Sequence, residues 1–143
     1  MKKIPWVFLG FSIIGFIDAL YLSIKHFMGA SEFCIIGNTC DKVLVSVYST
    51  ISNIPVALLG TIYYFIILIL IFNYFYSKKE KDLVFISYIS CIGFSASAWF
   101  VYLQLFVIKS ICSYCMISAI SSTILFITGI YFLIKNNKQN PEI

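Results

Sequence analysis

Four cysteines form two pairs whose types and spacing suit thiol–disulfide chemistry. Cys34 and Cys40 flank the turn signal Gly37-Asn38, so this loop can fold back and close a disulfide. Cys112 and Cys115 form a Cys-x-x-Cys motif, and residues at i and i+3 share one face of a helix, close enough for a strained disulfide. A thiolate attacks a disulfide sulfur, so two such pairs in contact can pass electrons from one to the other. The cysteines therefore predict an electron relay.

The second pair lies where a helix is expected to begin. Ser110 is a candidate N-cap, which places Cys112 in the first turn and Cys115 one turn deeper. Unpaired N–H groups and the positive end of the helix dipole stabilise a thiolate there. Two alternatives stay open, namely structural disulfides and a zinc ion held by all four cysteines. Cys91 is interpreted as a small buried apolar residue.

The amino-acid composition indicates that these cysteines belong to a membrane protein. Of the 143 residues, 61% are hydrophobic and only 11% are charged, against about 25% in soluble domains. Spanning a bilayer takes roughly 20 apolar residues. Four stretches reach that length, at about 4–24, 55–76, 83–108 and 111–134. We therefore expect an all-α integral membrane protein, with residues 1–143 forming a single domain built as a four-transmembrane-helix bundle.

Lysines predict the orientation of this bundle. The net charge of +4 comes from lysines at the ends of the apolar stretches and not from arginines, so it does not indicate nucleic-acid binding. Seven fall on one face: Lys2, Lys3, Lys78, Lys79, Lys81, Lys135 and Lys138. Lys25, Lys42 and Lys109 fall on the other. The positive-inside rule then places both termini in the cytoplasm and all four paired cysteines on the oxidising outer side of the inner or plasma membrane.

The connection after Cys40 is too short and too polar to span a bilayer. Apolar residues at helix-like spacing within 41–54 predict a short interfacial helix that covers the outer end of the bundle. Pro55 suits the first turn of the next helix.

Two further residues lie at the outer end of the first apolar stretch. Asp18 is an ionisable group inside a membrane helix and hence a functional candidate, but the favoured interpretation is an interfacial acid paired with Lys25 or a tyrosine hydroxyl. His26 could shuttle protons, but a surface histidine at the interface is favoured.

With these features in place, the chain resembles the vitamin K epoxide reductase family in its short prokaryotic form. The resemblance extends over about residues 5–134 and lies in Cys34, Cys40, Ser46, the Cys112-Ser113-Tyr114-Cys115 motif, and the stretches 40–44 and 54–60. It implies a four-helix bundle around a quinone of the ubiquinone or menaquinone type. It implies that electrons pass from a thioredoxin-like partner to the loop pair, then to the Cys-x-x-Cys pair and then to quinone.

The same resemblance implies individual roles. Cys34 would form the mixed disulfide with the partner, and Cys40 would attack Cys112. Cys115 would lie beside the quinone ring, and Ser46 would hydrogen-bond near the quinone head.

Two features depart from relatives. Many prokaryotic members carry a fused thioredoxin-like domain after the bundle, whereas none is expected here, so the partner would be a separate DsbA-like protein. Vertebrate enzymes have a tyrosine where this chain has Ala119, so quinone reduction coupled to disulfide formation is expected in place of epoxide reduction.

Two rival interpretations remain, one with the same chemistry but another order of cysteines, and one without redox chemistry. A DsbB-like quinone reductase would have its Cys-x-x-Cys motif near the outer end of the second helix, whereas here the motif opens the fourth. A non-catalytic membrane scaffold or transporter with structural disulfides would keep its function after Cys112 and Cys115 are replaced.

Overall fold

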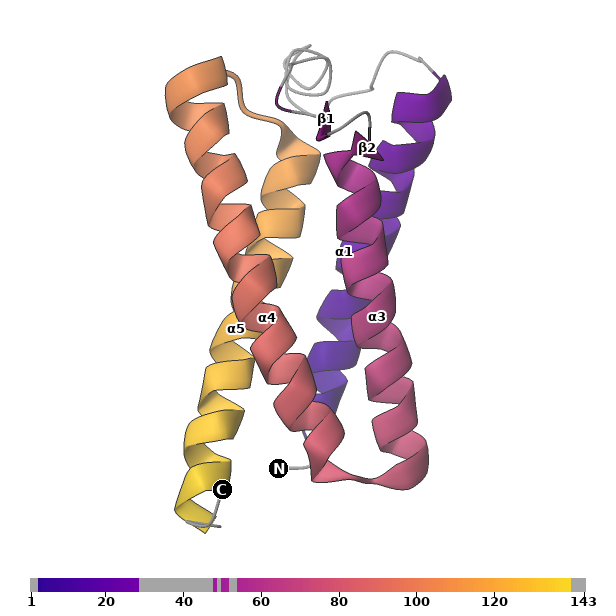
Figure 1. Ribbon diagram of the computed structural model, residues 1–143, viewed down its shortest axis with the longest axis vertical. Coiled ribbons are helices and arrows are strands. Elements are labelled where there is room, and N and C mark those ends of the chain that lie inside the picture. Colours follow the sequence, from indigo (N-terminus) through magenta and orange to yellow (C-terminus); the bar gives the residue numbers. More distant parts are fainter. Residues whose placement is uncertain (1–2, 29–47, 49, 52–53, 140–143) are drawn as a thin grey trace.

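Four long helices pack side by side in the computed structural model, which describes residues 3–28, 48, 50–51 and 54–139 (Figure 1). They are α1 (Ile4–Met28), α3 (Val56–Ser77), α4 (Glu80–Tyr102) with its π-helical continuation η2 (Leu103–Ile108), and α5 (Ser113–Gln139). The four spans Ile4–Met28, Val56–Ser77, Glu80–Ile108 and Ser113–Lys138 are long and apolar enough to cross a membrane. The predicted all-α membrane bundle is confirmed.

Four helix boundaries differ by two residues or more from the sequence-based prediction. The first helix continues to Met28, the third begins at Glu80, and the fourth extends from Ser113 to Gln139. The tight connection between α3 and α4 explains the early start at Glu80. Lys78 adopts a left-handed conformation with φ 50°, and its N–H closes the end of α3 on the Tyr74 carbonyl at 2.7 Å. Glu80 and Asp82 then complement the dipole in the first turn of α4.

The described residues just before α3 form a short pair of strands. Strand β1 (Thr50–Ile51) pairs antiparallel with β2 (Ile54–Pro55), and Thr50 lies opposite Pro55. Of the predicted interfacial helix at 41–54, residues 50–51 and 54 are therefore extended and not helical, whereas Tyr48 lies in a 3-10 turn. The other residues of 41–54 lie outside the described residues. Pro55 has an extended conformation with ψ 133°, so it precedes α3 and does not form its first turn.

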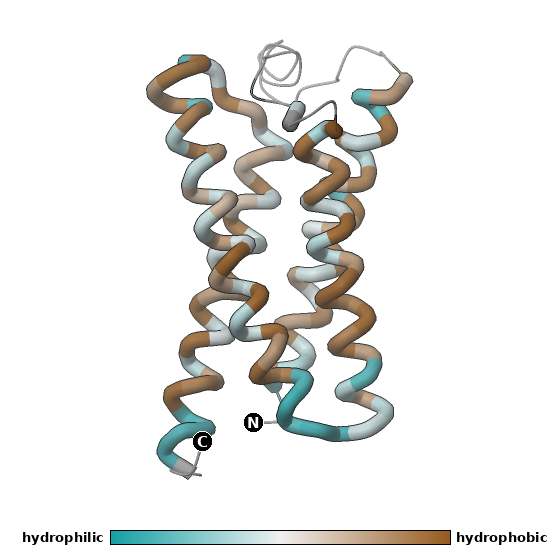
Figure 2. The backbone as a smooth tube through the Cα atoms, viewed as in Figure 1, coloured by the Kyte–Doolittle hydropathy of each residue, from teal (hydrophilic) through white to brown (hydrophobic). Residues whose placement is uncertain are grey.

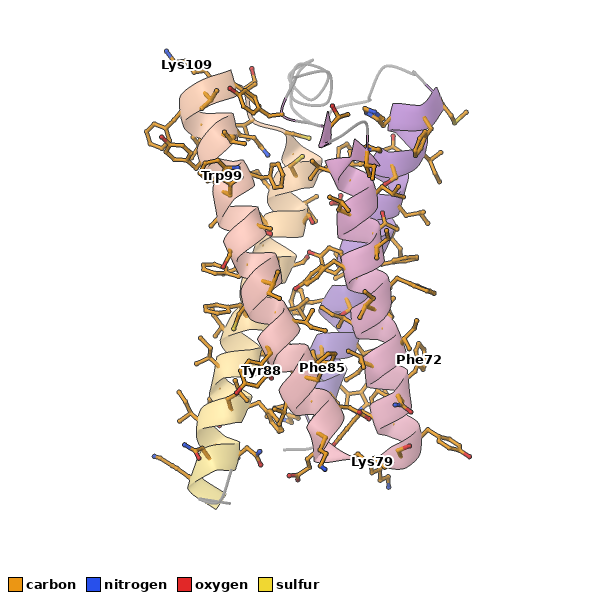
Figure 3. All side chains as sticks on the ribbon, in the orientation of Figure 1. Phe72, Lys79, Phe85, Tyr88, Trp99 and Lys109 are labelled. Carbon is orange, nitrogen blue, oxygen red and sulfur yellow. The ribbon has the colours of Figure 1, made fainter. Side chains whose placement is uncertain are left out.

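The two ends of the bundle differ in charge. Both termini and the α3–α4 connection lie at the lower end in Figure 1, whereas β1, β2 and the α4–α5 connection lie at the upper end. The lower end carries hydrophilic residues, including Lys79, and Lys109 lies at the upper end (Figures 2 and 3). Between the ends, exposed apolar side chains such as Phe72, Tyr88 and Trp99 stand on the outside of the bundle, as expected for contact with lipid.

The tightest packing lies toward the lower end. Buried apolar side chains from all four helices form one core there: Ile4, Phe8, Ile67, Ile71, Leu83, Ile86, Leu125 and Phe132. Small residues let the backbones approach, because a Cβ at Gly129 of α5 would lie only 3.1 Å from the Ser87 Cα of α4. Buried serines on α4 satisfy their hydroxyls within the helix, as Ser87 does by donating to the Leu83 carbonyl at 2.8 Å.

Candidate functional site

Cys112 occupies the position immediately before α5. Its carbonyl accepts the first helical hydrogen bond, from the Met116 N–H at 3.1 Å, so Cys112 is the N-cap residue. The prediction of Ser110 as N-cap is wrong, because its N–H instead donates to the Gln104 carbonyl at 3.1 Å and belongs to the preceding turn. At the N-cap position, a side-chain acceptor faces the free N–H groups of the first turn. The sulfur of Cys112 accordingly accepts hydrogen bonds from the backbone of Tyr114 and Cys115.

The two cysteines of the motif lie in direct contact. All cysteines that the structure describes are free thiols, and the side chains of Cys112 and Cys115 hydrogen-bond to each other. Cys112 is fully buried. The Cys115 side-chain hydrogen bond, followed by the backbone N–H groups of the first turn, lowers the pKa of Cys112, although burial and the Asp18 carboxyl oppose this shift. The lowered pKa makes Cys112 a better leaving group than an unperturbed thiol.

Gln104 joins the π-helix to both cysteines and was not anticipated from the sequence. Its Oε1 accepts the Cys112 backbone N–H at 3.2 Å, and its side chain also hydrogen-bonds to Cys115. Gln104 is only 3% exposed. Its polarity within a long apolar stretch was the one signal that could have marked it, because a buried polar residue in a membrane helix needs a partner.

A cavity of about 370 Å³ lies beneath these cysteines, in the upper half of the bundle. Cys115 contributes to its wall, together with residues from α1, α3, α4 and η2. The wall is mostly apolar, and its polar side chains include His26, Tyr48, Tyr63, Tyr64, Gln104 and Ser118. Leu59 of α3 and Ile92 of α4 also line the cavity and are exposed on the outer surface, so the cavity reaches the lipid-facing side between these helices. Its size and its apolar lining with few polar groups are typical of small-molecule sites.

Two adjacent tyrosines form the floor of this cavity. Tyr64 donates from its hydroxyl to the Ser118 carbonyl at 2.9 Å, and its ring fills the space that a side chain at Gly15 would take. The Tyr63 ring fills the corresponding space at Gly93, and the two tyrosine rings meet edge to face at 4.9 Å. The absence of side chains at these glycines therefore gives the cavity its shape.

Asp18 lies inside the bundle and not at an exposed interface. It is 8% exposed, and its Oδ2 has no hydrogen-bond partner among the residues that the structure describes. No ion pair between Asp18 and Lys25 is seen among the described residues, and the Lys25 Nζ instead lies 5.7 Å from the ring centroid of Tyr21. Asp18 is instead close enough to act electrostatically on Cys112. His26 lines the cavity and is half-buried.

The remaining predicted site residues, Cys34, Cys40 and Ser46, lie outside the described residues. The described elements that precede and follow these residues in the sequence lie at one end of the bundle. Met28, the last residue of α1, and strand β1 both lie at the upper end of the bundle, where α5 begins. Tyr48, just after the segment, lines the same cavity as Cys115.

Fold and site together define a multi-pass membrane protein with a buried dithiol at the head of an apolar cavity. The chain matches the model of the Vitamin K epoxide reductase family over residues 6–130. It therefore belongs to that family, whose members are quinone-reducing oxidoreductases, as the resemblance at the sequence level predicted. No curated protein gives a significant match.

Proposed function

We propose that this protein is a membrane thiol–disulfide oxidoreductase that passes electrons from a separate thioredoxin-like protein to a membrane quinone. Electrons would enter at Cys34 and Cys40, move to Cys112 and Cys115, and leave to the quinone. One observation carries the proposal: Cys115 lines the 370 Å³ cavity and is hydrogen-bonded to Cys112. The buried dithiol is thus in contact with a site that can hold its oxidant.

The residues of the cavity fit a quinone as substrate. A quinone head is a flat ring with two carbonyl oxygens, and the cavity offers aromatic and aliphatic walls with a few hydrogen-bond donors. Gln104 and Ser118 reach the cavity from its cysteine side, and Tyr63 and Tyr64 from its floor. The opening past Leu59 and Ile92 would let an isoprenoid tail remain in the bilayer. Both ubiquinone and menaquinone types suit such walls.

The exchange of electrons balances without a further reactant. The Cys112 and Cys115 thiols lose two electrons and two protons and form one disulfide, while the quinone gains both and becomes hydroquinone. A dithiol at Cys34 and Cys40 then reduces the Cys112–Cys115 disulfide, with Cys40 attacking Cys112. Attack at the Cys112 sulfur breaks the Cys112–Cys115 bond, so Cys115 is the leaving thiolate and is freed on the cavity side. Cys34 then attacks Cys40 and releases Cys112, whose lowered pKa makes it a good leaving group. The loop disulfide that results takes up electrons from the partner.

Topology supports placing this chemistry on the outer side of the membrane. Six described lysines, Lys3, Lys78, Lys79, Lys81, Lys135 and Lys138, belong to the helix ends opposite the cysteines. By the positive-inside rule that end faces the cytoplasm, and Cys112 faces the compartment where disulfides persist. A DsbA-like oxidant of secreted proteins would be the partner there.

The test is quinone reduction by the purified protein in detergent with a reduced thioredoxin-like donor. Cys112→Ala should abolish activity with every donor. Cys34→Ala should abolish activity with the protein donor only, and a small dithiol should restore it by reducing the inner pair directly. Unchanged activity in Cys112→Ala, or no quinone reduction by the wild type with any dithiol, would favour structural disulfides in a membrane scaffold.

A further inference from the structure

The Gln104 side chain contacts both halves of the Cys112–Cys115 pair at once. Its Oε1 lies 3.2 Å from the Cys112 backbone nitrogen, and the same side chain hydrogen-bonds to Cys115. It is buried and lines the cavity.

The chemistry of an amide determines which way this side chain faces. A backbone N–H can only donate, so the amide oxygen must face Cys112. The amide nitrogen, a donor, is then directed to the other side of the group, toward Cys115. A donor stabilises the negatively charged form of its acceptor more than the neutral form. Gln104 thus offers the Cys115 sulfur a hydrogen bond that strengthens when that sulfur becomes a thiolate.

The backbone around Gln104 holds the amide in this place. Gln104 lies in the π-helical turn Leu103–Ile108, and π-turns are rare and occur frequently at functional sites. Its carbonyl accepts the N–H of Lys109, which adopts a left-handed conformation with φ 53°, and that of Ser110 at 3.1 Å. These bonds end the helix and turn the chain back, so that Cys112 arrives above the Gln104 side chain. The backbone of Gln104 therefore stabilises the turn, and its side chain contacts the cysteine pair.

We propose that Gln104 is a positioning residue that stabilises the Cys115 thiolate when Cys112 is engaged in a disulfide with the loop pair. The two sulfurs would use different donors. Cys112 relies on the backbone N–H groups of the first turn of α5, and Cys115 relies on the Gln104 amide. The inference rests on the proposed relay, since only a relay needs Cys115 to be a free thiolate beside the cavity. Cys115 lies one turn into α5, beyond the N-cap. The Gln104 amide would therefore be its own hydrogen-bond donor, separate from those of Cys112.

Two substitutions separate the two contacts of the amide. Gln104→Glu keeps an oxygen that can accept the Cys112 N–H, but a carboxylate cannot donate to Cys115. Gln104→Leu removes both contacts at similar size. Leu105→Ala, in the same π-turn but on the exposed surface, is the matched control.

The readout is the rate at which N-ethylmaleimide alkylates each cysteine of the reduced full-length protein, followed at low conversion by site-resolved mass spectrometry. Loss of a donor to a thiolate should slow the alkylation of Cys115 by roughly three- to tenfold in both Gln104 variants. In Gln104→Glu the rate at Cys112 should stay within about twofold of wild type, because the first-turn donors of Cys112 remain. Leu105→Ala should leave both rates unchanged.

Rates at Cys115 within twofold of wild type in both Gln104 variants would overturn the proposal. So would slowing in Gln104→Leu alone, because that result would assign Gln104 only the anchoring of the Cys112 backbone. Thermal unfolding in detergent identifies a variant that fails to fold, and Gln104→Asn, which keeps the amide but is one methylene shorter, then takes its place with the same expected slowing at Cys115. The alkylation assay contains neither quinone nor partner. It therefore gives an answer even if the wild type proves unable to reduce quinone.

Discussion

The same four helices are closely packed in one half of the bundle and enclose a cavity in the other half. Toward the termini, large side chains such as Phe8, Ile71 and Phe132 interlock and are almost fully buried. Toward the cysteines, the same helices enclose a cavity of about 370 Å³. A cavity removes packing contacts and weakens its surroundings. Close packing near the termini thus stabilises the fold. This stability allows the other half to keep a cavity beside Cys112 and Cys115.

The largest effect should come from removing the sulfur beside the cavity. Cys115→Ser replaces a good nucleophile by a hydroxyl that stays protonated, so quinone reduction should fall by on the order of a thousandfold or more while the fold persists. The measurement is the initial rate of quinone reduction with a small dithiol donor. Cys91→Ser on α4, outside the cavity wall, is the control and should retain activity. Normal turnover in Cys115→Ser would refute its place beside the substrate.

A substitution in the closely packed half should have the opposite effect and lower stability without lowering activity. Phe132→Ala empties a site in the core that is 1% exposed, which should lower the free energy of unfolding by about 3–5 kcal/mol. Activity per folded molecule should change little, since Phe132 lies far along α5 from the cysteines. Reversible unfolding in mixed detergent micelles measures the first effect, and turnover at low temperature measures the second. A large drop in turnover without a loss of stability would mean that the two halves are not separate in function.

Two glycines of α1 test how closely the cavity floor is packed. At Gly15 a methyl group would overlap the Tyr64 ring, whereas at Gly10 nothing lies within 4 Å of the position of an added Cβ. Gly15→Ala should therefore destabilise the protein by about 1–3 kcal/mol through overpacking. Gly10→Ala should be neutral or stabilising by up to about 1 kcal/mol, because alanine is the better helix former. Equal unfolding free energies for the two variants would show that Tyr64 is free to move away.

The smallest effect concerns the pH at which Cys112 reacts. Hydrogen bonds from Cys115 and the first turn of α5 lower the pKa of Cys112. A lowered pKa means that more thiolate is present at neutral pH, so the alkylation rate should fall only when the pH drops below that lowered value. The midpoint of rate against pH, read at Cys112 by mass spectrometry, should therefore lie below the value of about 8.5 of an unperturbed thiol. A midpoint above 8.5 would mean that burial and Asp18 outweigh the hydrogen bonds.

Some features of the site could be predicted because they depend on local sequence. Apolar runs of spanning length determine the helices, and lysines at their ends mark one face of the bundle. The Cys-x-x-Cys spacing places Cys112 and Cys115 on one face of any helix that they begin. The start of α5 was misplaced, however, because a π-turn and the left-handed Lys109 extend the preceding turn as far as Ser110.

The sequence was sufficient for the helices, their antiparallel order and the pairing of Cys112 with Cys115, because hydrophobic length and i, i+3 spacing act within one segment. Tertiary packing alone decided the cavity, the burial of Asp18 and the contacts of Gln104. Gln104 precedes Cys112 by one turn and a connection, and only the conformation of that connection brings its amide to the Cys112 backbone N–H and to the Cys115 side chain. Likewise, Tyr64 and Gly15 belong to different helices, and their contact exists only when the bundle is assembled. Such contacts depend on how whole helices pack against one another, a property that no local pattern encodes.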